Sequence, residues 1–414
     1  DQLRVQRERL GITQHHKTDI PGEFSTLIRS AHQQYGQRVV VLIDEYDKPI
    51  LDNILEPERA REVREGLKNL YSVLKDADPH LHFVLLTGVS KFSKVSLFSG
   101  LNNLRDITLS PDYTTICGYT DENIDTVFAP ELPGLDREEI RQWYNGYRWG
   151  GREVESVYNP FDVLLLFQEQ EFGPYWFESA TPTFLVDILK QRGVFTPSLD
   201  HWETEYELLS QFDVDQISTE GLLFQTGYLT IQQVEEPLLG YRQYTLGFPN
   251  REVETSLNHA LLPSLGVENA PRERRTLFRH LSQHDLVGLE AHLKALYAGL
   301  PHDWYRNNPI ARYEGHYASV FYSHFAALGL DVTVEDASHH GKVDMSVDFG
   351  GHIYLFEFKV VEQLPEGQAL AQIKHKGYAD KYRASGKPIH LIGVEFSSAK
   401  RQIVAFDVET LDAM

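Results

Sequence analysis

The stretch GKVDMSVDFGGHIYLFEFKV, residues 341–360, constrains the fold of this chain more than any other part of the sequence. Gly350 and Gly351 separate two runs in which apolar and polar residues alternate, which indicates a β-hairpin with a two-residue turn. Such a turn fixes the strand register, because Phe349 must then face His352. We therefore expect an antiparallel strand pair near the C-terminus.

The predicted register gives the two faces of the hairpin different chemistry. Asp344 is expected directly opposite Glu357, and Lys359 follows Glu357 on the same face. Two facing carboxylates repel each other and destabilise the strand pair unless a cation lies between them. Hard oxygen ligands suit Mg²⁺, which takes one or two carboxylates together with waters and substrate phosphate. We predict a Mg²⁺ (or Mn²⁺) site there. The other face is expected to be the core side and carries Val343, Met345, Val347, Phe349, Tyr354, Phe356 and Phe358.

Helices on either side of the hairpin are expected to add to this site. A helix predicted to start at Asn308 and Pro309 places Glu314 on its apolar stripe, so the carboxylate should point inward. A second predicted helix, in ALAQIKHKGYADKY, carries Gln372. Nearby cations either hold a nucleic-acid backbone or form a solvated helix face. They are Lys374, Lys376, Lys381, Arg383 and Lys387.

A second acidic feature lies near the N-terminus, in VVVLIDEYDKPI. Residues 39–45 are predicted to form a fully buried strand that ends in Asp44 and Glu45. An amphipathic helix and another buried strand, ending at Thr87, follow it, which favours a parallel βαβ unit. Polar residues at such strand ends commonly line a ligand crevice. The alternative is that Asp44 and Glu45 form only a polar strand end that leads into a turn.

The acidic strand end is typical of nucleotide hydrolases, where it holds magnesium and orients water. That chemistry also needs a phosphate cradle of the G-x-x-x-x-G-K-[ST] type, and the 414 residues contain none. ATP binding is therefore expected only if an upstream phosphate loop is supplied.

The length of the chain exceeds a single hydrophobic core. We predict three domains, at residues 1–150, 151–300 and 301–414. Residues 110–200 are expected to be mainly helical and aromatic. Residues 205–262 suggest a helix, a hairpin and a helix, in which GLLFQTGYLTIQQ forms the first hairpin arm, and this order resembles a winged helix.

Charge and composition limit the classes of function. The net charge of −21 argues against a protein that coats nucleic acid. Residues 306–414 are nearly balanced, with 11 basic against 14 acidic residues, so a polyanion would dock there. We expect no membrane span, because no apolar run of about 18 residues is present. The single Cys117 suits a reducing cytoplasm.

The order of an inward glutamate, a hairpin aspartate, E-x-K and a glutamine resembles the PD-(D/E)XK nuclease superfamily. The stretches LIDEYDKPI, LLTGVSKFSKVSLFSGLNNL, NGY, NPF and GFPN resemble bacterial proteins that join an AAA-like ATPase domain to such a nuclease domain. The resemblance implies an α/β chain with three parts. They are a P-loop-type parallel sheet without its phosphate loop, a helical and winged-helix-like middle, and a restriction-endonuclease-like C-terminal domain.

The resemblance also implies roles for individual residues. In the nuclease part, Asp344 and Glu357 correspond to metal ligands, Lys359 to the catalytic lysine, Glu314 to the helical carboxylate and Gln372 to a supporting residue. In the ATPase part, Asp44 and Glu45 match the magnesium and water strand, and Thr87 matches the polar residue beside it.

The function that follows is a metal-dependent nuclease coupled to an AAA-like ATPase domain. Nucleic acid is the expected partner, with DNA the expected form. Two alternatives stay open, namely an ATPase or switch module and a non-catalytic scaffold that uses both folds for protein contacts. A second copy of the chain or a partner protein also stays open.

Overall fold

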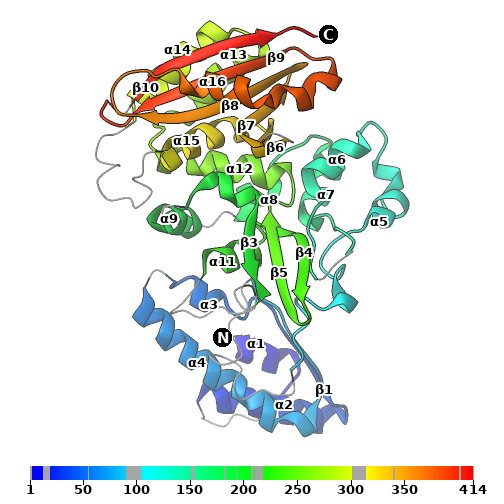
Figure 1. Ribbon diagram of the computed structural model, residues 1–414. Coiled ribbons are helices and arrows are strands. Elements are labelled where there is room, and N and C mark those ends of the chain that lie inside the picture. Colours follow the sequence, from blue (N-terminus) through cyan, green and yellow to red (C-terminus); the bar gives the residue numbers. More distant parts are fainter. Residues whose placement is uncertain are drawn as a thin grey trace. The chain divides into compact units, whose positions relative to one another are not determined.

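A computed structural model describes residues 2–12, 19–54, 56–89, 104–150, 154–180, 183–192, 194–206, 209, 218–300, 314–338, 341–400 and 402–413. The chain forms two compact units (Figure 1). The first consists of residues 1–116, 148–155 and 203–246, and the second of residues 117–147, 156–202 and 247–414. Among the described residues, no helix combines the length and the apolar character needed to cross a bilayer. The cytoplasmic location stays a prediction.

The first unit begins with the predicted strand–helix–strand arrangement. Its elements are α1 (Gln2–Arg9), α2 (Ile20–Tyr35), β1 (Val39–Ile43), α3 (Lys48–Leu51), α4 (Pro57–Asp76), η1 (Asp78–His80), β2 (Leu81–Leu86) and η2 (Pro111–Tyr113). β1 and β2 pair in parallel, as expected. The prediction of fully buried strands is wrong for the described residues, because Val40 is 50% and Leu42 68% exposed while Val41 is buried. Burial alternates along β1, so one face of this strand is covered and the other is exposed in the part of the chain that the structure describes.

The first unit also contains a three-stranded sheet in the order β3-β5-β4. Its elements are β3 (Trp202–Glu205), α11 (Thr219–Gln225), β4 (Thr230–Leu238) and β5 (Tyr241–Gly247). The hairpin of the predicted module is present, but the sequence GLLFQ lies in α11 and not in a strand. Ser218 caps this helix by accepting the Gly221 amide, and a short apolar run alone does not distinguish a helix from a strand.

The second unit is largely helical before its C-terminal sheet, as predicted for residues 110–200. The helices are α5 (Asp121–Thr126), η3 (Ala129–Glu131), α6 (Arg137–Tyr144), α7 (Pro160–Glu169), α8 (Tyr175–Ala180), α9 (Thr183–Arg192), η4 (Thr196–Asp200), α12 (Arg251–Leu261), η5 (Pro263–Leu265), α13 (Ala270–Ser282) and α14 (Leu286–Ala298). Aromatic and aliphatic side chains from α5, α6 and α7 form one buried cluster that includes Ile124, Tyr144 and Phe167.

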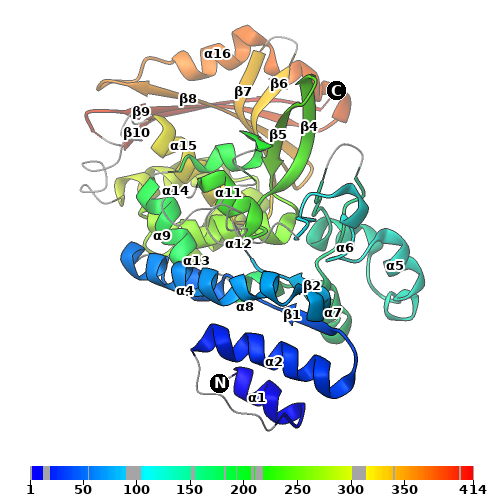
Figure 2. The ribbon, with the colours of Figure 1, turned by 90° about the horizontal axis from the view of Figure 1, so that it is seen from below.

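A five-stranded sheet with the order β10-β9-β8-β7-β6 completes the second unit. The elements are α15 (Glu314–Ala326), β6 (Asp331–Ser338), β7 (Gly341–Phe349), β8 (His352–Val361), α16 (Gln368–Lys376), η7 (Tyr378–Ser385), β9 (Ile389–Ser397) and β10 (Gln402–Leu411). Only β8 and β9 pair in parallel, and α16 and η7 form the crossover between them. Figure 2 shows α16 on one side of this sheet and α14 and α15 on the other.

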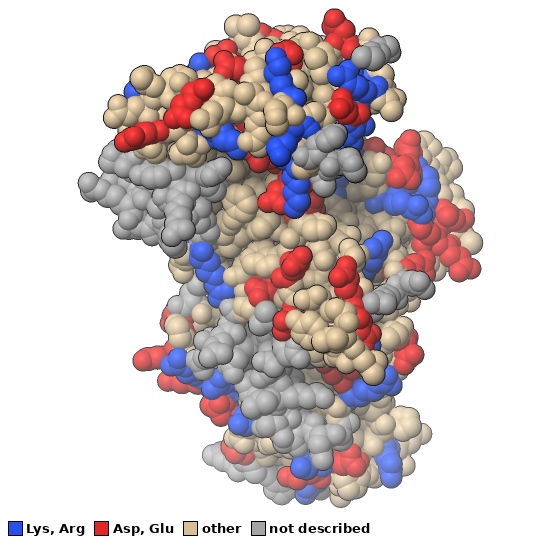
Figure 3. All heavy atoms as spheres, viewed as in Figure 1, with Lys and Arg blue, Asp and Glu red and all other residues tan. Residues whose placement is uncertain are grey.

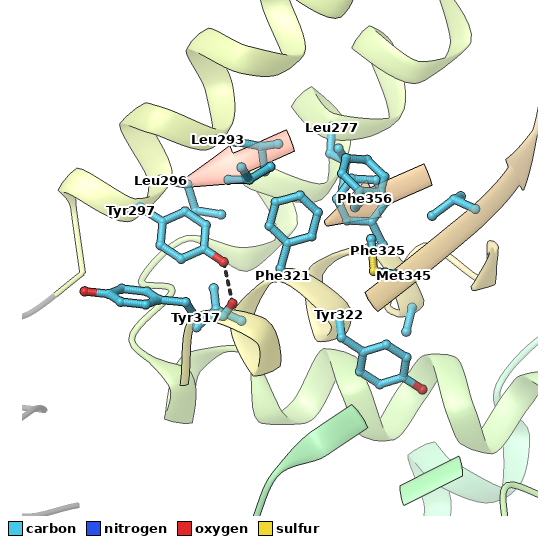
Figure 4. Close-up of a cluster of buried hydrophobic side chains, with 14 of the residues drawn as sticks. Leu277, Leu293, Leu296, Tyr297, Tyr317, Phe321, Tyr322, Phe325, Met345 and Phe356 are labelled. Carbon is cyan, nitrogen blue, oxygen red and sulfur yellow. Dashed lines mark hydrogen bonds between the residues drawn. The ribbon is translucent and has the colours of Figure 1, made fainter. Parts of the chain in front are cut away.

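Both faces of the C-terminal sheet are therefore buried, whereas the sequence indicated one core face. The larger core packs Met345, Phe356 and their neighbours against α13, α14 and α15 (Figure 4). The smaller core packs β8 and β9 against α16 and η7. Val343 lies in the smaller core and Met345 in the larger one, so the predicted core face is wrong at Val343. The β6–β7 pairing is interrupted between these two residues, where Glu335 has a left-handed φ of 48°.

The motifs NPF and GFPN lead into a buried pair of carboxyl groups in the second unit. Asp162 on α7 and Glu252 on α12 are both fully buried, and each lies within the electrostatic influence of the other. The Asp162 carboxyl accepts the Trp176 amide at 2.8 Å, and that of Glu252 accepts the Phe177 amide at 3.1 Å. Burial, followed by the charge of Asp162, raises the pKa of Glu252 far above its ordinary range. Burial and the neighbouring carboxyl group therefore both favour the protonated form of Glu252.

Candidate active site

The β7–β8 hairpin has the register that the two glycines predict. Five pairs are formed, from Phe349 with His352 at the turn to Met345 with Phe356. The ladder ends there, so Asp344 and Glu357 follow its last pair and do not form another one. The Asp344 carboxylate instead accepts the amide of Phe358 at 2.7 Å. A backbone donor that the ladder leaves unused thus fixes the Asp344 side chain beside Glu357.

Glu357 lies at the centre of the site, with 1% of its surface exposed. Its Oε1 atom accepts hydrogen bonds from Lys359 Nζ at 3.2 Å and from Gln372 Nε2. Its Oε2 atom is buried and has no hydrogen-bond partner among the described residues. Burial, followed by the charge of Asp344, raises the pKa of Glu357 to about 7, against the opposing effect of Lys359. Among the described residues, the charge of Lys359 thus does not offset the combined effect of burial and Asp344 on the pKa of Glu357.

The arrangement fits a hard divalent cation. Glu357 offers a buried oxygen that no described residue hydrogen-bonds, and the nearby Asp344 offers a second carboxylate. Mg²⁺ usually keeps several waters and takes only one or two carboxylates from the protein, so two acidic ligands are sufficient. In the part of the chain that the structure describes, no group of three or more His, Cys, Asp or Glu residues could hold a metal. Glu314 is the first residue of α15, but its side chain lies outside the described part.

We expect metal binding to change the stability of the chain in a way that depends on Asp344. Mg²⁺ or Mn²⁺ at about 100 times its dissociation constant should add roughly 2.7 kcal/mol to the unfolding free energy. Asp344→Asn should remove this increment while leaving the metal-free protein equally or more stable, because a repulsive charge is lost. Thermal unfolding with and without metal measures both effects. Asp348→Asn is the control. A clear loss of stability in the metal-free Asp344→Asn protein would indicate instead that Asp344 forms a structural ion pair.

The basic residues near α16 are largely engaged within the protein. Lys374 pairs with Glu409 at 2.5 Å, Lys387 with Asp348 at 2.5 Å, Arg383 with Asp380 at 2.9 Å, and Lys381 with the buried Asp336. Figure 3 shows basic and acidic side chains interspersed over the C-terminal part of the chain. The predicted basic helix face is therefore mostly neutralised, and its use for a nucleic-acid backbone would require these pairs to open.

Sequence reasoning missed two buried acids of the C-terminal sheet. Glu395 on β9 is fully buried, and Asp336 on β6 is 6% exposed. The Asp336 carboxylate bonds Lys381 and accepts Ser346 Oγ at 3.2 Å. A single acid within an apolar strand, as in HLIGVEFS, is the signal that would have found Glu395, because a buried charge needs partners.

The N-terminal candidates form a separate group in the first unit. Thr87 Oγ1 donates to Asp44 Oδ1 at 2.5 Å, so the ends of β1 and β2 are joined. Glu45 has a φ of 49°, in the left-handed region, and its amide donates to the same Asp44 oxygen at 3.0 Å. Asp44, Glu45 and Thr87 are all exposed, so this strand end is open to solvent.

Comparison with known proteins matches both ends of the chain. Residues 1–98 match a family model described as predicted AAA-ATPase, and residues 312–406 match one described as PD-(D/E)XK nuclease superfamily. A protein of Azotobacter chroococcum mcd 1, described as an uncharacterized protein in the vnfD 5′ region, is 60% identical over 411 residues. That match covers 99% of this chain and 79% of the relative. No solved structure matches the chain.

Proposed function

The chain belongs to the family of predicted AAA-ATPase proteins that carry a PD-(D/E)XK nuclease superfamily domain, and from this premise we propose that its C-terminal domain is a metal-dependent nuclease. The substrate is a nucleic acid, with DNA the expected form. The observation that carries the proposal is the buried Glu357, whose Oε2 atom has no partner among the described residues while Asp344 and Lys359 lie beside it.

Each residue of the site has a distinct task in this proposal. Asp344 and Glu357 hold the metal, which when bound polarises the scissile phosphate and lowers the pKa of a water. Lys359 stabilises the negative charge that develops on the phosphoryl group. Gln372 donates to Glu357 Oε1 and so directs the other oxygen toward the metal. Glu314 stands as the helical carboxylate of the site by resemblance to the family.

The N-terminal part supports a second role, in nucleotide response. The contact between Thr87 and Asp44 joins the ends of two parallel strands, where ligand crevices commonly lie. Asp44 and Glu45 would hold magnesium and orient water if a phosphate loop were supplied. Coupling of such a domain to the nuclease is part of the proposal.

Calorimetric titration with Mn²⁺, combined with cleavage of a labelled duplex and a labelled single strand, tests the nuclease. Glu357→Ala removes a ligand, so metal affinity and turnover should fall together. Glu362→Ala removes an exposed acid just beyond the same strand and should change neither. A parent protein that binds no Mn²⁺ would favour the non-catalytic scaffold.

A further inference from the structure

Glu395 is a buried carboxylate on β9 that holds the start of α16. Its Oε1 atom accepts the amides of Gln368 at 2.7 Å and Ala369 at 3.4 Å, and its Oε2 atom accepts the amide of Glu366 at 2.6 Å. The N-cap residue Gly367 supplies no side-chain cap. Amides in the first turn of a helix have no partner within that helix. A carboxylate from the neighbouring strand therefore serves as the cap of α16.

The backbone of α16 approaches β9 unusually closely. A side chain at Gly393 would place its Cβ atom 2.3 Å from the amide nitrogen of Leu370, so only glycine fits there. Ile373, on the same helix, is buried in the smaller core. The helix is thus seated directly on the strand that carries Glu395 (Figure 1).

The same helix carries Gln372, whose side chain donates to Glu357. Gln372 lies one turn beyond Gln368, the residue whose amide Glu395 binds, so a shift of the helix start would move Gln372 as well. A continuous path of contacts therefore runs from Glu395 through the first turn of α16 to Glu357.

We propose that Glu395 is a positioning residue of the metal site: it fixes α16 so that Gln372 holds Oε1 of Glu357 and leaves Oε2 free for the metal. This inference rests on the proposed function. In this proposal Glu395 is not itself a metal ligand and acts through the helix, although Lys359 is its neighbour in the β8–β9 ladder. The simpler reading, a cap that only stabilises the fold, predicts no specific coupling to Gln372.

A double-mutant cycle on the full chain, with Mn²⁺ affinity measured by calorimetry, separates the two readings. Glu395→Ala and Gln372→Ala should each weaken Mn²⁺ binding roughly tenfold or more, as loss of a residue that orients a metal ligand commonly does. The double variant should be no weaker than the weaker single variant, because both remove the same support. Effects that multiply, or a Glu395→Ala protein with parental affinity, would overturn the proposal.

Asp285→Ala is the matched control, because it also removes a capping carboxylate in the same unit. Asp285 accepts the Gly288 amide at 2.8 Å at the start of α14, a helix that does not carry Gln372. The control should lower the melting temperature and leave Mn²⁺ affinity unchanged. A comparable loss of affinity in the control would show that general destabilisation is the cause.

Glu395→Gln keeps the size of the side chain and serves if the alanine variant does not fold. The glutamine side chain has one acceptor oxygen where Glu395 has two, so it cannot bind the Glu366 amide and the Gln368 amide in the same way. The backbone amides of α16 should therefore exchange hydrogen faster than in the parent protein. Amide hydrogen exchange is measured in the absence of metal. If the parent binds no Mn²⁺, the proposed function fails, while unchanged exchange along α16 would overturn the role of Glu395 by itself.

Discussion

Replacing Lys359 with alanine should slow single-turnover cleavage about a hundredfold or more, because a charged group aimed at the transition state is lost. Mn²⁺ should still bind, since both proposed ligands remain. Lys359 also lowers the pKa of Glu357, whose carboxylate it contacts at 3.2 Å, so metal affinity is best compared at a pH well above 7. There Glu357 is ionised in both proteins, and the difference in rate reports the chemical step.

Lys376→Ala is the control for Lys359→Ala. Lys376 is an exposed lysine on α16, so its loss removes the same charge from the same domain without touching Glu357. It should slightly flatten the salt dependence of substrate binding and leave the chemical step unchanged. If the Lys359→Ala protein cleaves as fast as the parent, the β7–β8 hairpin is not the nuclease centre.

The second large effect is expected at the buried carboxyl pair. Glu252→Gln should raise the unfolding free energy at pH 8 by on the order of 1–3 kcal/mol, since each unit of pKa difference corresponds to about 1.4 kcal/mol. The folded state holds a proton on Glu252 that the unfolded state releases above its ordinary pKa of 4.5. Stability contributed by this group therefore falls as the pH rises, and glutamine donates to Asp162 without a titrating proton.

Chemical denaturation at several pH values between 7 and 9 measures this effect. Histidines whose pKa is lowered by burial, such as His324 and His292, add slope only near the lower end of this window, and they add it equally in the parent and the variant. Glu122→Gln, at an exposed position of α5, should leave the pH dependence unchanged. Equal slopes for the parent and Glu252→Gln would mean that Glu252 does not hold a proton in the folded state at these pH values.

The sequence predicts the hairpin well because its register depends on local chemistry alone. Gly350 and Gly351 determine the turn, and the turn determines that Asp344 and Glu357 come together at the far end of the strands. The supporting role of Gln372 is implied by the family resemblance alone, and the structure places its side chain on Glu357. The hairpin prediction needs no knowledge of what packs against the sheet.

The failures lie where a distant segment decides the outcome. Val40 and Leu42 are apolar, but the alternation of covered and open faces along β1 depends on which elements cover the sheet. The sequence predicts that the lysines near α16 are available to solvent or to a nucleic-acid backbone. In the structure most of them form ion pairs with acidic residues from β6, β7 and β10. Likewise, Glu395 lies 27 residues beyond the amide of Gln368 that it binds, a separation that no local pattern reveals.

The parallel pairing of β8 with β9 also orders events during protein synthesis. Glu357 leaves the ribosome well before Glu395, and α16 lies between them in the chain. A nascent chain that ends before β9 has no cap for α16 and no strand on which to seat it. The contact between Gln372 and Glu357 would therefore form only after most of the domain has been translated.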